Sequence, residues 1–134
     1  MTDAVLNVAV ITPEGAAYEG TASMVVVPAF DGEVAFLVGH APFVGALGAG
    51  EMRVTTAEGE KQFYLEGGVV QVLDNEVAVL AEAVRSIEQL DPEAELEALK
   101  AALAVPATSA AGQVERQRKA EAARARLRLA QRGK

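Results

Sequence analysis

The residues best suited to chemistry lie in one short stretch, residues 31–54. It reads DGEVAFLVGHAPFVGALGAGEMRV and contains the chain's single histidine, His40, with the carboxylates Asp31 and Glu33 before it. An imidazole with a carboxylate partner is a common general acid–base pair. No serine or cysteine stands near His40 as a nucleophile, however, and carboxylates at positions i and i+2 without an electrophile beside them are typical of a solvated turn. The favoured interpretation is therefore a corner imidazole that satisfies backbone groups.

The residues around His40 indicate the elements that must hold it. Asp31-Gly32 is a turn pair, and the apolar run Val34–Val38 ends at Gly39. Pro42 fixes its own φ and biases the residue before it away from helix. The stretch therefore predicts a strand, a rigid corner and a second strand.

The composition limits the chain to one sizeable core and excludes several kinds of site. Of 134 residues, 51% are hydrophobic and only 4% aromatic, which suits a core built from small aliphatic side chains. The lack of cysteine removes disulfides, thiolate nucleophiles and sulfur-ligated metals, and one histidine cannot build an imidazole-rich metal site, so we expect no metal or cofactor. The N-terminal sequence has no basic region before an apolar run, and no segment approaches bilayer length. We expect a cytosolic or peripherally attached chain.

Residues up to about 84 are predicted to form an antiparallel β-sandwich. Short β-branched runs are separated by turn residues, with Asp74-Asn75 as a hairpin turn and no room for a long helix. Numerous glycines supply the turns and close approaches that such packing requires. The seven predicted strands are Leu6–Ile11, Met24–Val27, Val34–Val38, Glu51–Thr55, Gln62–Leu65, Val69–Leu73 and Val77–Leu80.

Beyond this point the apolar period changes from that of strands to that of helices. Asp91 can cap a helix that begins at Pro92, with three leucines at i, i+3 and i+7 on one face. Residues 105–109, VPATS, break this helix, and a second one rich in Ala, Arg and Leu is predicted over residues 111–132. The leucines of the first helix are Leu96, Leu99 and Leu103.

The predicted fold is α+β in sequence order: an N-terminal antiparallel β-sandwich, residues 1–86, followed by a C-terminal two-helix antiparallel hairpin, residues 87–134. The net charge also differs between the N-terminal part of the chain and its C-terminal end. Residues 1–113 carry 17 acidic and 4 basic side chains, a net −13, whereas residues 114–134 carry 2 acidic and 8 basic ones, a net +6. Such a division indicates an interaction segment for an acidic protein surface, anionic lipid, nucleic acid or the chain's own acidic part. Nucleic acid is the less favoured partner, because no aromatic stacking platform accompanies the arginines.

The second predicted helix has two distinct faces. Its small apolar stripe permits close packing but buries little area per residue, so we expect weak docking and a hairpin able to detach. Arginines four residues apart occupy another face, where the solvated surface of an ordinary packed helix is the alternative interpretation. The stripe is Ala120, Ala123, Leu127 and Ala130, and the basic face is Arg124, Arg128 and Arg132.

Three stretches closely resemble the epsilon subunit of bacterial F-type ATP synthases. They are LNVAVITPEGAAYEG, then SMVVVPAFDGEVAFLVGHAPFVGALGAGEMRV, then FYLEGGVVQVLDNEVAVLAEAVR, and the resemblance covers about residues 5–90. Its most specific parts are the run GHAP at residues 39–42 and the pair Gly67-Gly68. Ala35 and Val38 stand where the family commonly has a glycine and a proline, so we expect a corner of slightly different shape.

This resemblance implies a non-catalytic rotor subunit of a proton-translocating ATP synthase. Its sandwich would be clamped to the gamma subunit and rest on the c-ring, at the cytoplasmic face of the bacterial plasma membrane, with membrane association only through the complex. In the family, the loop matching Ala29–Glu33 faces the c-ring, and the loop matching Gly39–Pro42 lies at the same end of the sandwich. The contact residues implied for the c-ring and gamma subunit are Asp31, Glu33, His40 and Pro42.

The resemblance also implies a regulatory role for the two helices. In many bacterial members the hairpin extends along the central stalk toward acidic segments of the catalytic alpha and beta subunits and blocks ATP hydrolysis. The arginines expected to supply this contact are Arg116, Arg118, Arg124, Arg126 and Arg128.

Some relatives bind ATP between the two helices as a weak regulatory ligand. Their motif is Ile or Leu, then Asp, two further residues, Arg and Ala. The nearest match here, VERQRK at residues 114–119, keeps only the arginine, so an ATP site is not favoured. Glu115 and Arg118 would be its nucleotide-binding residues.

Two other classes of protein remain open from the residues alone. A hydrolase or carbohydrate-binding module would use His40 with Asp31 and Glu33, but the chain lacks a nucleophile near them and any tryptophan, and the hairpin has no role in that reading. A stand-alone adaptor would bind an acidic protein or lipid surface through its arginine helix and would need no rotor. Salt-dependent binding of the isolated tail to anionic vesicles would favour the adaptor.

Overall fold

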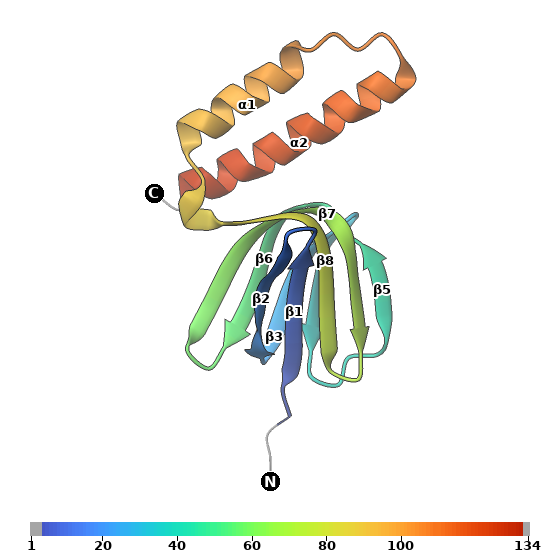
Figure 1. Cartoon of the computed structure of the whole chain (residues 1–134), viewed down its shortest axis with the longest axis vertical. Helices are drawn as coiled ribbons and strands as arrows, with labels where there is room; N and C mark the ends of the chain where they lie inside the picture. Colours follow the sequence, from blue (N-terminus) through green and yellow to red (C-terminus); the bar gives the residue numbers. More distant parts are fainter. Residues whose placement is uncertain (1–3, 133–134) are drawn as a thin grey trace. The chain divides into compact units, whose positions relative to one another are not determined.

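The computed structural model describes residues 4–132, which divide into two compact units, one ending at Val84 and the other beginning at Arg85. The first unit contains the strands and the second the helices, so the predicted order of a sandwich followed by a helical hairpin is confirmed (Figure 1). None of the helices within residues 4–132 has the length and apolar character needed to span a bilayer.

Eight strands form between residues 4 and 84 or continue just beyond them. The patterns do not predict β2, because its sequence GAAYEGTA has a single β-branched residue; it becomes extended by pairing along β1, from Leu6 opposite Ala22 to Thr12 opposite Gly15. β5 is the second strand expected after the corner. The strands are β1 Leu6–Thr12, β2 Gly15–Ala22, β3 Met24–Ala29, β4 Gly32–Leu37, β5 Phe43–Ala46, β6 Ala49–Thr56, β7 Gly59–Leu73 and β8 Glu76–Ser86.

The long strand β7 connects the two layers of the sandwich. Strands follow the order β2-β1-β8-β7-β6-β3-β4, with β5 paired to β7 off this path, and β1 and β8 run parallel. β6 pairs with the first half of β7, up to Glu66, and β5 pairs with the second half, from Val69 onward. Figure 1 shows β7 curving over one end of the sandwich between these partners. The predicted strands Gln62–Leu65 and Val69–Leu73 are therefore two parts of one strand.

Gly67 and Gly68 make the bend in β7 possible. Both have positive φ, +67° and +110°, a backbone conformation that residues other than glycine adopt only with strain. A Cβ placed on Gly68 would lie 1.9 Å from the carbonyl oxygen of Leu80 on the neighbouring strand β8. A glycine is required here both by backbone conformation and by the close approach of two strands.

The sandwich core is made almost entirely of aliphatic side chains. In β1 the alternation is regular: Leu6, Val8 and Val10 are buried, whereas Asn7 and Ile11 are exposed. Phe36 and Tyr64 are the largest of the fully buried side chains in the described chain. At about 1.5–3 kcal/mol for each fully buried Val or Leu side chain, this core supplies the main stabilisation of the first unit.

The second unit contains two helices, α1 Pro92–Ala104 and α2 Ala110–Arg132, after a short 3₁₀ turn at Ile87–Gln89. The predicted cap is confirmed, because the Asp91 side chain accepts a hydrogen bond from the backbone N–H of Glu93 and Pro92 is the first helical residue. α1 ends where the extended Val105 precedes a proline. Ser109 then accepts a hydrogen bond from the backbone N–H of Gly112 in the first turn of α2.

Alanine, rather than leucine, dominates the buried surface of the hairpin. Leu96 and Leu103 are 40% and 48% exposed, whereas Glu95 and Ala102 are the buried residues of α1. Three residues of the predicted stripe on α2 are buried and Leu127 is half-buried. Small side chains bring helix axes close together, which leaves the longer leucines of α1 at the margin. The buried residues of α2 are Ala120, Ala122, Ala123, Ala125, Leu129 and Ala130.

Candidate functional site

The tight turn between β3 and β4 presents an exposed aromatic ring and two carboxylates. Phe30 is 84% exposed at its tip, and Asp31 and Glu33 follow as exposed residues. Two backbone hydrogen bonds to residues 46–48 fix the turn. The Phe30 N–H donates to the carbonyl of Ala46 at 3.0 Å, and the Gly48 N–H donates to the carbonyl of Pro28 at 2.8 Å. A large apolar side chain on a fixed turn is a feature of protein contact sites.

Arg53 on β6 links this turn to the body of the sandwich. Its guanidinium donates to the carboxylate of Glu33 at 3.0 Å and to that of Glu51 at 3.1 Å. The hydrogen bonds from Glu51 and then Glu33 raise the pKa of Arg53 above its ordinary value. Since the Glu51 side chain is only 6% exposed, Arg53 also compensates a buried charge.

Sequence reasoning misses Arg53, although one signal was available. It is the first Lys or Arg of the chain, and it alternates along β6 with the apolar residues Met52 and Val54. The pairing of β3 with both β4 and β6 could not be read from the sequence, and that pairing is what brings Arg53 beside Glu33.

The structure separates the four contact residues that the family resemblance groups together. Strand β4 runs its full length between the turn that carries Asp31 and the corner that carries His40. At about 3.3 Å per residue, the six residues of β4 place these ends roughly 20 Å apart. The structure thus places the two loops at opposite ends of β4, and the contact roles of the four residues stay predictions. Asp31 and Glu33 can share a contact, whereas His40 and Pro42 belong to the opposite end.

His40 has the surroundings of a corner residue. Its Nδ1 lies 2.6 Å from the carbonyl oxygen of Ala41, so this nitrogen carries the proton and donates. The ring packs edge-on to Phe36, with centroids 5.1 Å apart, and lies 6.2 Å from Phe43. The corner is tied to the β7–β8 turn, because the Gly39 N–H donates to Oδ1 of Asn75 at 2.8 Å. This geometry agrees with the interpretation that His40 satisfies backbone groups.

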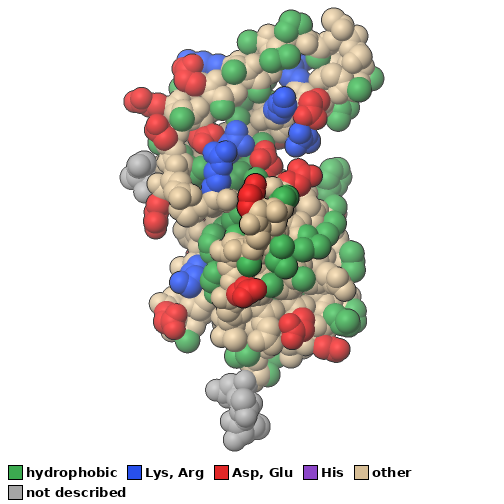
Figure 2. Space-filling view, in the orientation of Figure 1, with side chains coloured by type: hydrophobic (Ala, Val, Ile, Leu, Met, Phe, Trp, Pro, Cys, Tyr) green, Lys and Arg blue, Asp and Glu red, His purple; other side chains and the backbone are tan. Residues whose placement is uncertain are grey.

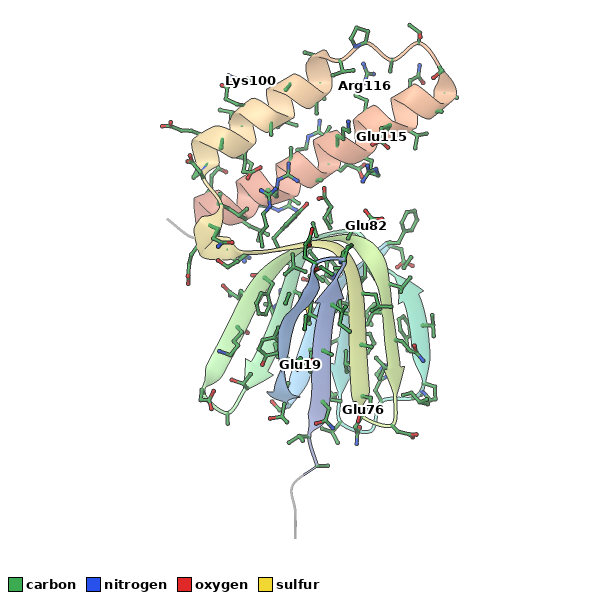
Figure 3. All side chains as sticks on the ribbon, in the orientation of Figure 1. Glu19, Glu76, Glu82, Lys100, Glu115 and Arg116 are labelled. Carbon is green, nitrogen blue, oxygen red and sulfur yellow. The ribbon has the colours of Figure 1, made fainter. Side chains whose placement is uncertain are left out.

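The predicted regulatory arginines fall into two groups. Arg116, Arg118 and Arg126 have partners within the helical unit: Arg116 donates to the carbonyl of Val105 at 3.3 Å, Arg118 pairs with Glu115 at 2.6 Å, and Arg126 pairs with Glu95 at 2.6 Å. Figure 3 shows Glu115 and Arg116 at the start of α2. Arg124 and Arg128 are exposed on α2. In Figure 2 most Lys and Arg side chains on the visible face belong to the helical unit, as the charge division predicts.

The segment that sequence analysis matched to the nucleotide motif, residues 114–119, contains an internal ion pair. Glu115 and Arg118 lie one turn apart on α2, and the hydrogen bond from Arg118 lowers the pKa of Glu115. The same motif can also be laid on Leu90–Glu95, which keeps Leu and Asp but has Ala94 and Glu95 where Arg and Ala belong. Neither segment offers a free cation and a small residue for a nucleotide. Within residues 4–132 no three His, Cys, Asp or Glu side chains lie together as a metal site.

Comparison with known proteins agrees on one family. The sequence family described as "ATP synthase, Delta/Epsilon chain, beta-sandwich domain" matches residues 5–87. The ATP synthase epsilon chain of Leptospira borgpetersenii is 40% identical over 94 residues, covering 70% of this chain and 74% of that protein. The ATP synthase epsilon chain of Shouchella clausii is 41% identical over 90 residues, covering 67% and 68% of the two chains.

Two solved structures share the fold at low sequence identity. A chain of the Euglena gracilis mitochondrial ATP synthase, in a complex of OSCP, F1 and c-ring, superposes with a TM-score of 0.81 at 20% identity and covers 92% of this chain and 80% of that chain. A chain of the Tetrahymena thermophila mitochondrial ATP synthase central stalk and c-ring superposes with a TM-score of 0.73 at 14% identity, covering 97% and 99%.

Proposed function

Because the chain belongs to the ATP synthase delta/epsilon chain family, as a non-catalytic accessory subunit, we propose that it is a central-stalk rotor subunit. In this role it couples proton flow through the c-ring to ATP synthesis, and its C-terminal helices inhibit ATP hydrolysis. The match of the family to residues 5–87, the whole sandwich, carries the first part of this proposal. The working location is the cytoplasmic face of a bacterial plasma membrane, where the chain is held through the complex.

The proposed c-ring contact is the β3–β4 turn. Phe30 supplies exposed apolar area there, and Asp31 supplies a carboxylate. Glu33 is paired with Arg53, so it adds little net charge to the contact. His40 and Pro42 are left out of this contact, because β4 separates them from the turn.

The proposed gamma-subunit contact is an apolar strip on the outer face of the sandwich. Ile11 on β1 lies opposite Leu80 on the adjacent strand β8, and both are exposed. The outward side of β7 continues the strip toward β5. An exposed apolar face of this extent on a sheet favours burial against a partner chain. The exposed members of the strip are Ile11, Val44, Val69, Leu73 and Leu80.

The proposed inhibitory element is the helical hairpin, acting on acidic segments of the catalytic alpha and beta subunits. Its support is the concentration of positive charge, a net +6 over residues 114–134 against −13 for the rest. Arg124 and Arg128 are already exposed in the folded hairpin. The alanine interface holds the helices together with little buried area per residue, so release costs less than from a leucine seam.

The test is ATP hydrolysis by the assembled enzyme with the full chain or with a chain that ends at residue 87. We expect the shortened chain to assemble and hydrolysis to rise severalfold. Unchanged hydrolysis with intact assembly would refute inhibition by the hairpin. Salt-dependent binding of residues 88–134 to anionic vesicles, without any binding of the whole chain to an ATP synthase, would instead support the adaptor.

A further inference from the structure

Glu95 is a buried carboxylate held between two arginines of the helical unit. Only 7% of its side chain is exposed, and its Oε1 accepts a hydrogen bond from Nε of Arg126 at 2.6 Å. Arg126 is itself only 14% exposed. Arg85, at the end of β8, lies 3.8 Å from the other carboxylate oxygen. The cluster therefore ties the first turn of α1 to the last turns of α2 and to the strand that leads into the hairpin.

A buried ion pair behaves differently from the alanine packing around it. Alanine side chains are small and nearly interchangeable. Their contacts let the two helices pack closely but do not select one register of the hairpin. Removing one member of a buried pair leaves an uncompensated charge out of water, which strongly disfavours the closed state. When both members return to water together, by contrast, neither is left unpaired. The Glu95–Arg126 pair therefore makes the separation of the two helix ends cooperative: both charges are buried together or both return to water.

Arg126 is also one of the arginines proposed to contact the catalytic subunits. It cannot do so while its guanidinium is buried against Glu95. Arg124 and Arg128, on either side of it, are exposed and carry no such restriction. The same arginine is therefore required by two different arrangements of the hairpin.

We propose that Glu95 is a latch that keeps the hairpin closed and withholds Arg126 from the inhibitory contact. Glu95 would then oppose inhibition although it touches no other subunit. The latch itself is a property of the isolated chain, whereas the withholding of Arg126 rests on the proposed inhibitory function. The two parts can be tested separately.

The latch is tested by hydrogen exchange on the full chain. Glu95→Gln should speed exchange of the α1 and α2 amides by about a hundredfold, because the buried ion pair between Glu95 and Arg126 is then lost. Glu97→Gln is the matched control, since it removes the same charge from the same helix at a side chain that is 76% exposed. The double variant Glu95→Gln with Arg126→Gln should exchange no faster than Glu95→Gln alone, because the Glu95–Arg126 pair is already broken in the single variant. Equal exchange in Glu95→Gln and Glu97→Gln would overturn the latch.

The withholding of Arg126 is tested by ATP hydrolysis of the assembled enzyme. Glu95→Gln should lower hydrolysis severalfold relative to Glu97→Gln, and adding Arg126→Gln should reverse part of that loss. If exchange accelerates in Glu95→Gln but hydrolysis does not fall, while the chain ending at residue 87 does raise hydrolysis, the withholding of Arg126 is wrong. If that shortened chain leaves hydrolysis unchanged, the proposed inhibitory function has failed, and hydrogen exchange still decides the latch.

Discussion

The sandwich and the hairpin are stabilised by different means, although they belong to one short chain. The sandwich buries large aliphatic and aromatic side chains from strands that are far apart in sequence, with Phe36 and Tyr64 fully enclosed. The hairpin buries mostly alanine, with one well-buried carboxylate, Glu95, on α1. Pairing between distant strands and a large core make the first unit rigid. The second unit is easier to rearrange, because its buried side chains are small and each buries little apolar area.

This difference matches the two parts of the proposed function. A rotor subunit needs a body that transmits force without changing shape, and the sandwich supplies it. A regulatory element needs two arrangements of similar free energy, which an alanine interface with an ionic latch can provide. We expect substitutions in the sandwich to be costly and general, and those in the hairpin to be smaller and local.

The largest expected effect is that of Gly68→Ala. The new Cβ would collide with the Leu80 carbonyl at 1.9 Å, so the β7–β8 pairing must open, and we expect a loss of about 4 kcal/mol or more in unfolding free energy. Urea unfolding followed by circular dichroism measures it. Gly59→Ala separates the backbone cost from the collision, since Gly59 has φ +127° but open space around it, and should cost about 1–3 kcal/mol. Equal losses would show that the close approach of β7 to β8 is unimportant.

Arg53→Met should have the next largest effect, because it takes an ion-pair partner from the buried Glu51. We expect a loss of about 1–3 kcal/mol, reduced from a fully buried value because the Arg53 side chain is 29% exposed. Glu33→Gln is the control: its carboxylate is 57% exposed, so its loss should cost less than about 1 kcal/mol. A larger loss for Glu33→Gln than for Arg53→Met would contradict this assignment of Arg53 to Glu51.

Asp91→Ala should affect only the hairpin. Loss of the cap at the start of α1 should cost about 1 kcal/mol, seen as a lower thermal midpoint for the helical signal, with the sandwich transition unchanged. Glu93→Gln keeps the backbone N–H that the cap satisfies and should change stability by only a few tenths of a kcal/mol. A shift of both transitions by Asp91→Ala would show that the two units unfold together.

The smallest expected effect is the pH dependence of the Glu115–Arg118 pair. The pKa of Glu115 is lowered in the folded helix, so its contribution is present above the ordinary glutamate pKa and is lost as pH falls through the lowered value. The side chains are about half exposed, so we expect a slight loss of helicity on acidification. Far-UV circular dichroism of the full chain should show this loss in the wild type and not in Glu115→Gln. The same titration curve for both would show that the Glu115–Arg118 pair does not stabilise the helix.

The sequence predicts the elements well where the signal is local. The Asp91 cap, the break before Pro106 and the Asp74-Asn75 turn, which has φ of 50° and 63°, all depend on neighbouring residues. β2 is missed because its extended form depends on β1. The leucines of α1 follow a helical period, yet alanine on α2 decides which side of α1 is buried.

The candidate sites were harder to predict, because each depends on contacts between distant segments. The Glu33–Arg53 pair needs β3 between β4 and β6, and the Glu95–Arg126 pair needs the register of the hairpin. The family resemblance places the loops of Asp31 and His40 at the same end of the sandwich, whereas β4 lies between them in the structure. From the charge pattern, Arg126 is assigned to a contact with another subunit. Only the fold shows that it already pairs with Glu95 of its own chain.

The most direct test of the central claim is binding of a gamma subunit from the same source by the full chain and by a chain ending at Ser86. We expect tight binding by both, because the sandwich has its own core and carries the proposed contact, with the hairpin left as the regulator. No binding by either would contradict the rotor assignment and return the chain to the adaptor class.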